Sequence, residues 1–423
     1  MKTFYHCLNS KGLIVIMQFH FQKNLFGKMF SGVREPLGRW ILRHVAEFLV
    51  LCPAILFTWV WLKLCRKQVL IVGQTSNTIS QFIAPLEPEL RKRIQDPELM
   101  RRAIVLNLSS DANSQIRTMY DRVVKIYGAE AKLKRRLIWW ASQKGICRRV
   151  LVEDQSDLSW VIHSPSVSLT ADEEAFGQNF LDKHGLEKFK YLCYTVRSES
   201  YYLARIAEGE KVLPNSIRNP KESVYLDVAN LYASKEYKVL RMGKDLSAGV
   251  RPGDHSNVID YANHLRSDFL DVYLMKYCKF DFVGNTGIVW LRWIWNLPNV
   301  HGDSYLIRRN QIKNDLFILQ RVLLLKEGRF ATFMEMLQMD HYSVEKRMEG
   351  LGVSLVKNTV EEIKAVCDEM NARIDGTWVT TEEDEELQRR YQELIVKYSN
   401  KPEWNGGGRI GAQFLRDNQD LLR

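Results

Sequence analysis

The stretch QVLIVGQTSNTISQFIAPLEPELRKR, residues 68–93, opens the regular pattern of the chain. A short β-branched run comes first, a turn of Gly, Thr, Ser and Asn follows, and apolar residues at helical spacing complete it. This order predicts a strand, a turn and a helix, which together open an α/β unit. A second unit follows, with a strand predicted at 103–108 and a helix at 114–126. Strands that alternate with helices predict a parallel sheet with helices on both faces.

The alternation returns in the second half of the chain. Strands are predicted at 191–196, 237–242 and 279–283, and helices are predicted at 223–234 and 267–276 between them. Because one hydrophobic core rarely extends over 423 residues, we predict an α/β protein with two tandem Rossmann-like domains.

We divide the chain into three parts. Residues 1–67 form an N-terminal segment, residues 68–180 an N-terminal α/β domain, and residues 181–423 a C-terminal α/β domain that ends in helices. The pattern becomes helical from Asn314 onward, with helices predicted at 316–325, 330–338, 359–372 and 381–398.

One strongly apolar run, VAEFLVLCPAILFTWVWL at residues 45–62, lies in the N-terminal segment. It is at the lower limit for a membrane span, which needs roughly 17 to 25 apolar residues. Glu47 and Pro53 interrupt it, and basic residues flank both of its ends, so the positive-inside rule gives no orientation. The run is compatible with a helix in the membrane interface, a crossing helix or a buried core helix. We expect this apolar helix to associate with a membrane.

The chain carries 60 Lys and Arg against 50 Asp and Glu, a formal net charge of +10. Such an excess attracts nucleic acids, anionic membranes or phosphorylated small molecules, and its sign alone does not choose among them. The segment KLKRRLIWWASQKGICRR, residues 132–149, interleaves basic residues with Trp139 and Trp140. It predicts an amphipathic helix whose tryptophans pack on the core, with a membrane or nucleic-acid surface as the alternative.

Several catalytic motifs are absent from the sequence. No GxGxxG follows the first predicted strand, and neither GxxxxGK[ST] nor GxSxG occurs, so dinucleotide binding, P-loop hydrolysis and a hydrolase nucleophile elbow lack support. The formal GxGxxG match at 406–411 follows SNKPEWN, which predicts a flexible turn. Seven cysteines without CxxC spacing and nine histidines without HExxH predict neither a zinc site nor a disulfide framework. An odd number of unpatterned cysteines fits a reducing cytoplasm.

Candidate ligand-binding residues follow the predicted strands, because an open parallel sheet binds ligands outside the carboxyl ends of its strands. Arg197 follows the strand at 191–196, Arg241 and Gly243 end the next strand, and the turn GNTG lies at 284–287. An arginine matches a diphosphate bidentately, and glycines let the backbone approach a ligand closely. Pairing of these arginines with nearby carboxylates is the alternative.

The segment that leads to the GNTG turn supplies such carboxylates. Asp260, Asp268 and Asp271 lie in it, with Arg266 between them. Ser267 and Asp268 stand at the start of a predicted helix, where they suit capping of the helix end. On residue chemistry alone, these residues could equally cap a helix, form buried ion pairs or take part in catalysis.

The order of four motifs is more specific than their spacing: KYLCYTVRSESYY, SIRNP, KVLRMG and VIDYANHLRSDFLDVYLMKYCKFDFVGNTGI. In this order they resemble a bacterial family of glycosyltransferases associated with surface polysaccharide synthesis. The resemblance covers the chain from Lys190 to its end. It implies a fold of the GT-B type, in which the C-terminal domain holds a nucleotide-sugar donor and the N-terminal domain the acceptor. After the turn, VWLRWIWNLP is bulkier than the family's pattern, which narrows the donor pocket or supplies rings that stack on a base.

Within this resemblance we assign roles to individual residues. Arg197 and Arg241, with N–H groups near Thr286, would stabilise the departing diphosphate without a metal. Asp260 would contact the ribose or base, and Asp268 would orient Arg266. The predicted catalytic residues are therefore Arg197, Arg241 and Asp268. Donor binding is assigned to Arg218, Asn219, Gly243, Asp260, Tyr261, Arg266, Ser267, Gly284, Asn285, Thr286 and Gly287.

The predicted function is transfer of a sugar from a nucleotide-sugar donor to a hydroxyl of a surface glycan or lipid-linked acceptor. No metal and no cofactor other than this donor substrate are expected. We expect the protein in the cytoplasm, at the inner face of the membrane. The alternative is a non-catalytic basic α/β protein that binds nucleic acid or an anionic membrane surface. Arginines at strand ends, instead of along one exposed helix, argue against nucleic acid as a partner.

Overall fold

The computed structural model describes residues 53–72, 78–142, 147–149, 163–197, 200, 203, 206–207, 219–244, 249, 251, 253–304, 314–339, 350–398 and 407–423. The chain divides into two compact units, Met1–Trp61 and Leu62–Arg423. Residues 53–64 are helical, and the first part of the apolar run, 45–52, lies outside the described residues. None of the helices in the described ranges combines the length and the apolar character that crossing a bilayer requires.

A four-stranded parallel sheet forms the N-terminal part of the second unit. Its spatial order is β3-β2-β1-β4. Nearly every residue of its two central strands is buried, as expected where both faces are covered. The strands are β1 (Gln68–Val72), β2 (Ala103–Asn107), β3 (Ile126–Tyr127) and β4 (Cys147–Arg149). The helices are α4 (Ile79–Ile94), α5 (Pro97–Arg102), α6 (Ser114–Asp121) and α7 (Lys132–Ser142), with a 3₁₀ turn η1 (Ala129–Ala131).

The helix predicted at 114–126 is confirmed only as far as Asp121. It begins after Asn113, whose side chain accepts a hydrogen bond from the N–H of Ile116 at 3.0 Å, a usual N-cap. It ends early because Asp121 Oδ1 accepts a hydrogen bond from the N–H of Ile126 at 3.1 Å, which directs the chain into β3. The amphipathic helix predicted within 132–149 is confirmed as α7, and β4 follows it.

A seven-stranded parallel sheet forms the larger part of the second unit, in the order β14-β10-β9-β8-β5-β6-β7. The predicted α/β class with parallel sheets is confirmed. The strands are β5 (Leu192–Val196), β6 (Val239–Arg241), β7 (Val258–Ile259), β8 (Asp281–Gly284), β9 (Asn299–Ser304), β10 (Leu316–Leu319) and β14 (Arg409–Ile410). The helices are α9 (Ala171–Lys183), α11 (Glu222–Ala233), α12 (Tyr261–His264), α13 (Asp268–Tyr277), α14 (Val289–Trp293), α17 (Val360–Ile374) and α19 (Ala412–Asp417).

A small antiparallel sheet, in the order β12-β11-β13, accompanies the last helices. The predicted helices at 359–372 and 381–398 are confirmed, and the one at 330–338 begins only at Phe333. The remaining elements are β11 (Arg321–Leu324), β12 (Arg329–Phe330), β13 (Val353–Val356), α15 (Phe333–Gln338), α18 (Glu382–Tyr398) and η3 (Gln419–Leu422).

Two predictions in this region are wrong. Residues 316–325 form the strands β10 and β11 instead of a helix. All of β10 is buried, and a short apolar run fits a buried strand as well as a helix. The flexible turn predicted at 406–411 is wrong over its described part, because β14 pairs with β10 there. Gly411 is tightly packed: a Cβ atom added to it would lie 3.1 Å from Ile318 Cγ2.

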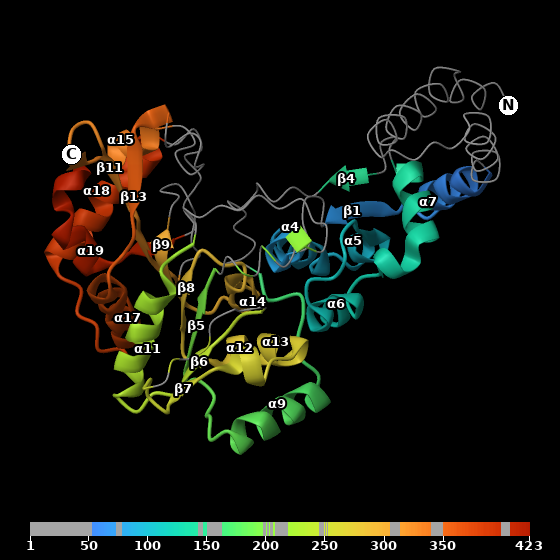
Figure 1. Cartoon of the computed structure of the whole chain (residues 1–423). Helices are drawn as coiled ribbons and strands as arrows, with labels where there is room; N and C mark the ends of the chain where they lie inside the picture. The colour runs from blue at the N-terminus through green and yellow to red at the C-terminus, as the bar shows by residue number, and fades with distance from the viewer. Residues whose placement is uncertain are drawn as a thin grey trace. The chain divides into compact units, whose positions relative to one another are not determined.

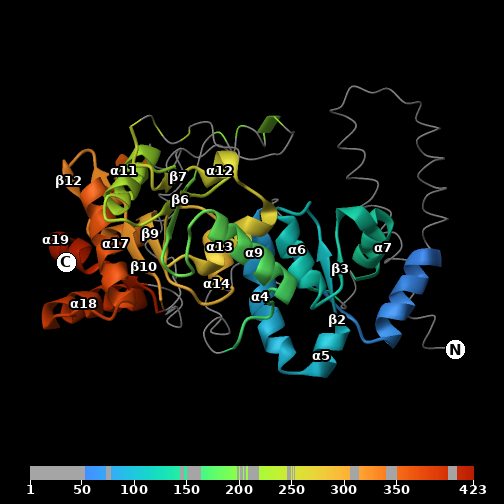
Figure 2. The ribbon, with the colours of Figure 1, turned by 90° about the horizontal axis from the view of Figure 1, so that it is seen from below.

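Different helices cover the two faces of the seven-stranded sheet (Figure 1). Leu192 and Tyr194 of β5 belong to one hydrophobic cluster with α11 and α17, whereas Cys193 belongs to a second cluster with α13 and α14. The second cluster also includes Leu70 and Val72 of β1 and much of α4. Accordingly, α4 and α6 lie beside α14 and α13 (Figure 2). The predicted boundary between the two α/β domains stays a prediction.

Two glycines allow α11 to approach the sheet. Gly284 of β8 and Gly302 of β9 are register partners. A Cβ atom at Gly302 would overlap Tyr225 of α11 and Ile363 of α17, and one at Gly284 would overlap the ring of Pro220. The first glycine of the GNTG turn is therefore required by packing, whatever else it does.

We expect Gly302→Ala to destabilise the protein by about 1 to 3 kcal/mol, because the added methyl group has no space between α11 and α17. Urea unfolding measures the change. Gly350→Ala is the matched control, because a Cβ atom there meets nothing within 4 Å, and its effect should stay within about 0.5 kcal/mol. Equal stabilities of the two variants would contradict this packing.

Candidate functional site

The carboxyl ends of β5, β6, β8 and β9 lie at one edge of the larger sheet, because these strands are parallel neighbours. Arg197 directly follows β5, Arg241 ends β6, and β8 ends in the turn 284–287. The N–H of Arg197 donates to the carbonyl of Gly284 at 3.1 Å. The structure thus brings the backbone of Arg197 and the GNTG turn together, and Arg197 is largely buried.

Arg241 is held by two carboxylates. Its side chain is 1% exposed, its Nε donates to Glu222 Oε1 at 2.8 Å, and its Nη1 lies 3.2 Å from Asp260 Oδ1. Glu222 begins α11, and Asp260 caps α12 by accepting from the N–H of Asn263. One guanidinium and two carboxylates leave this cluster with a formal charge of −1. The predicted catalytic role of Arg241 therefore faces a competing structural role.

Tyr261 and Ser267 stabilise the fold next to Asp260. Tyr261 is fully buried, and its hydroxyl donates to Asp271 Oδ1 at 2.9 Å while accepting from the N–H of Ser267 at 3.2 Å. The Ser267 hydroxyl accepts from the N–H of Leu270 at 3.1 Å and caps α13. These contacts match the capping interpretation of the sequence.

Arg266 bridges two carboxylates on α13. Its Nη2 lies 2.8 Å from Asp268 Oδ1 and 2.7 Å from Asp271 Oδ2. Burial raises the pKa of Asp271 to about 6, although Arg266 opposes the shift. The predicted pairing of Asp268 with Arg266 is therefore present in the structure, and its role in catalysis stays a prediction.

Asp268 also links α13, which packs on the larger sheet, to the start of α6, which packs on the smaller one. Its Oδ2 accepts hydrogen bonds from the N–H and the hydroxyl of Ser114, at 2.7 and 2.8 Å, and its carbonyl accepts from Asn113 Nδ2 at 2.9 Å. Burial alone would raise the pKa of Asp268. The hydrogen bonds from Ser114 and Arg266 together outweigh burial, so the pKa is lowered from its ordinary value. A carboxylate with these partners is held ionised against the start of α6.

The GNTG turn faces the first turn of α4. A Cβ atom added to Gly287 would lie 3.5 Å from Ser80 Oγ, and Ser80 Oγ lies 3.1 Å from Thr78 Oγ1. Thr78 is the N-cap of α4, whose first turn has no acidic residue. The N–H groups at the start of α4, the hydroxyls of Thr78 and Ser80, and the glycine backbone therefore gather where an anionic group is stabilised.

Asn285 and Asp303 share an uncommon backbone conformation at this edge. Their φ angles are 53° and 51°, in the left-handed region that few residues other than glycine adopt. Asn285 Nδ2 donates to the carbonyl of Asp303 at 2.7 Å. Asparagine and aspartate tolerate this region better than most other residues. Asp303 joins the candidate site because its carbonyl contacts the GNTG turn, although the sequence analysis missed it.

Lys357 and Asn358 are further residues that the sequence analysis missed. The N–H of Asn358 donates to Asp303 Oδ1 at 2.9 Å, and Asn358 Oδ1 accepts from the N–H of Asp303 at 2.7 Å. Burial lowers the pKa of Lys357, whereas nearby Asp303 opposes the shift. The one sequence signal for this position is the capping box that begins at Thr359 and starts α17.

The structure gives fewer contacts for the other predicted donor-binding residues. Asn219 is half-buried just before Pro220, and Gly243 follows β6 with a φ of 140°. Arg218 lies outside the described residues. Among the described residues, no three His, Cys, Asp or Glu side chains are grouped as metal ligands would be.

Two of the three tryptophans after the turn are core residues. Trp290 and Trp293 are buried, and their ring centroids lie 4.4 Å apart in an edge-to-face contact. Trp293 Nε1 donates to Asp315 Oδ2 at 2.8 Å. Because these rings are packed against the interior, we expect no stacking on a nucleotide base from them.

No protein-family model and no curated protein match the chain. Among solved structures, it is similar to the glycosyl transferase family 9 protein from Veillonella parvula, with 12% identity over 56% of this chain and 80% of that chain and a TM-score of 0.37. It is also similar to the Escherichia coli heptosyltransferase WaaC with ADP, with 12% identity over 67% of this chain and 97% of that chain and a TM-score of 0.33. The iron-containing glycosyltransferase TibC from enterotoxigenic E. coli shows 14% identity over 56% of this chain and 59% of that chain, with a TM-score of 0.30.

We expect Arg241→Met to destabilise the protein by about 3 to 5 kcal/mol, because it leaves the carboxylates of Glu222 and Asp260 without their buried cation. Arg251→Met is the matched control, because Arg251 pairs with Asp227 and Asp254 while it is 47% exposed. Its loss should cost under about 1 kcal/mol. Urea unfolding measures the stability of both variants. A loss from Arg241→Met as small as that from Arg251→Met would contradict a structural role for Arg241.

The raised pKa of Asp271 makes stability depend on pH. The folded protein binds this proton more tightly than the unfolded chain, so the contribution of Asp271 is full below the ordinary pKa of 3.8 and is lost as pH rises through about 6. Between about pH 4 and pH 7, the wild type should lose up to about 3 kcal/mol relative to Asp271→Asn.

Asp268→Asn is the control for this measurement. The pKa of Asp268 is lowered, so its contribution is present above the ordinary value of 3.8 and is lost only as pH falls further. The difference between wild type and this variant should therefore change much less over the same range, with a small slope that remains because Asp268 contributes to the raised pKa of Asp271. Urea unfolding in a pH series measures both differences, and parallel profiles would contradict the assignment to Asp271.

Proposed function

We propose that this protein is a glycosyltransferase of the GT-B type that moves a sugar from a nucleotide-sugar donor to a hydroxyl of a surface glycan or lipid-linked acceptor. The observation that carries the proposal is the meeting of the GNTG turn with the first turn of α4, next to Arg197. This edge gathers helix N–H groups, hydroxyls and a guanidinium, which suit a diphosphate. The order of the sequence motifs supports the same function.

The donor diphosphate binds beside the turn and the start of α4 in this proposal, because the two already lie in near contact. Charge that develops on the leaving diphosphate is stabilised by Arg197, by the Thr286 hydroxyl and by N–H groups of the first turn of α4. Transfer then needs no metal ion. The half-buried Lys357 lies on the same edge, next to Asp303, and adds a cation whose pKa is lowered by burial.

Arg241 acts as a positioning residue in this proposal. Because its cluster with Glu222 and Asp260 has a formal charge of −1, it stabilises a diphosphate poorly. It holds the Asp260 carboxylate at the end of β6, where that carboxylate accepts hydrogen bonds from a ribose. Asp268 in turn holds the donor-binding half against α6 of the acceptor-binding half.

The acceptor is bound by the N-terminal α/β domain, and residues 1–67 associate with the inner face of the cytoplasmic membrane. The exposed side chains of Phe57 and Leu64 in the helix at 53–64 support this association, because large apolar side chains suit a membrane interface. Proximity to the membrane would present a lipid-linked acceptor.

Thr286→Val tests the donor site. The change keeps the shape of the side chain but removes a hydroxyl, and we expect a roughly tenfold weaker affinity for the preferred nucleoside diphosphate, about 1.4 kcal/mol. Calorimetric titration of the wild type with ADP, UDP, GDP, CDP and dTDP first identifies the nucleotide that binds most tightly. A second titration with that nucleotide then compares the dissociation constants of Thr286→Val and the wild type.

Ser234→Ala is the control, because Ser234 is an exposed hydroxyl residue at the opposite end of α11. Its affinity should equal that of the wild type. If none of the five nucleotides binds while RNA binds with a steep salt dependence, the alternative of a basic nucleic-acid-binding protein replaces the proposal.

A further inference from the structure

A pocket of about 510 Å³ lies at the amino ends of β5, β6 and β8, the edge opposite to the candidate donor site. Its lining includes Tyr191 just before β5, Lys238 just before β6 and Lys279 shortly before β8. Small-molecule sites commonly measure roughly 300 to 1,000 Å³. This pocket is therefore large enough for one or two sugar rings.

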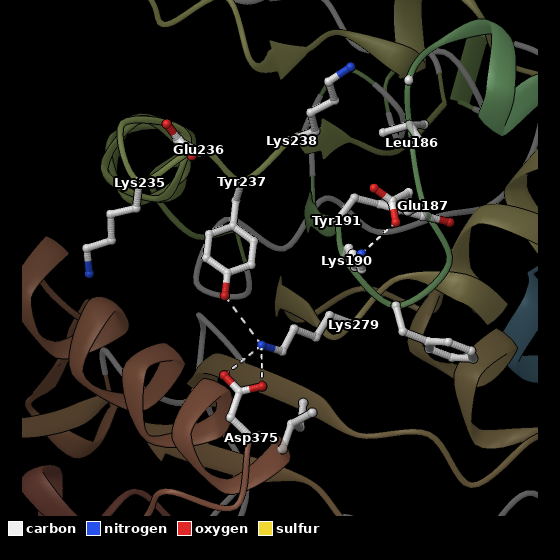
Figure 3. Close-up of a pocket in the computed structure, with 13 residues that line it drawn as sticks. Leu186, Glu187, Lys190, Tyr191, Lys235, Glu236, Tyr237, Lys238, Lys279 and Asp375 are labelled. Atoms are coloured by element: carbon white, nitrogen blue, oxygen red, sulfur yellow. Dashed lines mark hydrogen bonds and ion pairs between the residues drawn. The ribbon is translucent and has the colours of Figure 1, made fainter.

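Lys279 lies between Tyr237 and Asp375 in the pocket lining (Figure 3). Its Nζ donates to Asp375 Oδ2 at 2.8 Å and lies 3.3 Å from the Tyr237 hydroxyl. That hydroxyl donates to Asn371 Oδ1 of α17 at 3.1 Å. The three lining side chains present an ammonium group, a hydroxyl and a carboxylate together, so they can donate to and accept from the hydroxyl groups of one ligand.

Two lysines stand at the exposed rim of the same pocket. Lys190 pairs with Glu187 at 2.6 Å while 70% of its side chain is exposed, and Lys235 lies 3.7 Å from Asp368 while 53% is exposed. Exposed pairs of this kind contribute little to stability. An anionic ligand can therefore replace these partners at small cost.

The backbone at the rim is strained. Phe189 and Glu236 have φ angles of 62° and 69°, in the region that disfavours residues other than glycine. The Phe189 ring is half exposed, and its centroid lies 5.6 Å from that of Tyr277 in an edge-to-face contact. An exposed ring held at a pocket rim offers a flat apolar surface to a ligand.

We propose that this pocket binds an anionic saccharide unit, a sugar ring that carries a carboxylate or a phosphate. The ring hydroxyls bond to Lys279, Tyr237 and Asp375, the apolar face of the sugar covers Phe189, and the rim lysines bind the anionic group. Four lysines and three acidic residues line the pocket. Because Asp368 outside the lining also pairs with Lys235, charge alone attracts an anion weakly, and hydroxyl groups that bond to the lining favour an anionic sugar over inorganic phosphate.

The inference does not rest on the proposed function. The pocket and the donor site lie at opposite edges of one sheet and share no residue, so binding at each is measured separately. Nucleoside diphosphate affinity should stay unchanged in variants of the pocket, and saccharide affinity should stay unchanged in Thr286→Val.

The test is calorimetric titration of the full chain with four probes: a hexuronate trisaccharide, glucose 6-phosphate, maltotriose and inorganic phosphate. We expect saturable binding of the hexuronate trisaccharide, of glucose 6-phosphate or of both. Binding of the first shows that the pocket accepts a carboxylate, and binding of the second shows that it accepts a phosphate. The double variant Lys190→Glu, Lys235→Glu should weaken that binding at least tenfold. Phe189→Asn should weaken it as well, because asparagine tolerates the left-handed backbone but lacks the ring.

The double variant Lys132→Glu, Lys134→Glu on α7 is the matched control, because it changes the net charge equally at exposed lysines of a helix beside the other sheet. It should leave saccharide binding unchanged. The proposal is overturned if neither anionic sugar binds, if maltotriose or inorganic phosphate binds as tightly as they do, or if the α7 control weakens binding as much as the pocket variant. Thermal unfolding confirms that each variant remains folded.

Discussion

Tyr225 of α11 fits over β8 and β9 because both strands carry a glycine where its ring lies. From that position its hydroxyl donates to Asp303 Oδ2 at 3.2 Å, and the carbonyl of Asp303 accepts from Asn285 in the GNTG turn. The turn is therefore held by a chain of contacts that starts with helix packing. Larger residues at either glycine would move α11 outward, and the left-handed backbone at Asn285 and Asp303 would lose the contacts that maintain it.

Carboxylates decide which arginines of this edge can serve a ligand. Arg241 and Arg266 each contact two carboxylates, so little of their positive charge reaches the surrounding space. In the proposed donor site, fixed dipoles, the N–H groups of α4 and of the turn, would therefore supply much of the affinity for a diphosphate. Fixed dipoles need little reorganisation during a reaction, which makes them effective stabilisers of developing charge.

Periodicity predicted the strands and helices that form the carboxyl edge, because strand β8 and helix α13 have unambiguous local patterns. It failed at residues 316–325, where an apolar run fits a strand or a helix and the choice depends on pairing with β9 and β14. The candidate ligand edge was predicted from the carboxyl ends of the strands alone, and it stays a prediction. Two pairings could not be predicted from the sequence: that of Arg241 with Glu222 and that of Asp303 with Asn358. Each pairing joins segments that come together only through tertiary packing.

The two edges of the larger sheet differ electrostatically for one reason. Helices of an α/β sheet run antiparallel to its strands, so α9, α11, α13 and α17 end near the amino edge, where their carbonyl groups carry partial negative charge. Lysines there are stabilised by these helix ends, as the bond from Lys238 Nζ to the carbonyl of His184 shows at 2.7 Å. The fold thus accumulates ammonium groups at the amino edge. An anionic saccharide would use charge that helix ends already hold in place, whereas a diphosphate is better matched to the helix starts at the opposite edge.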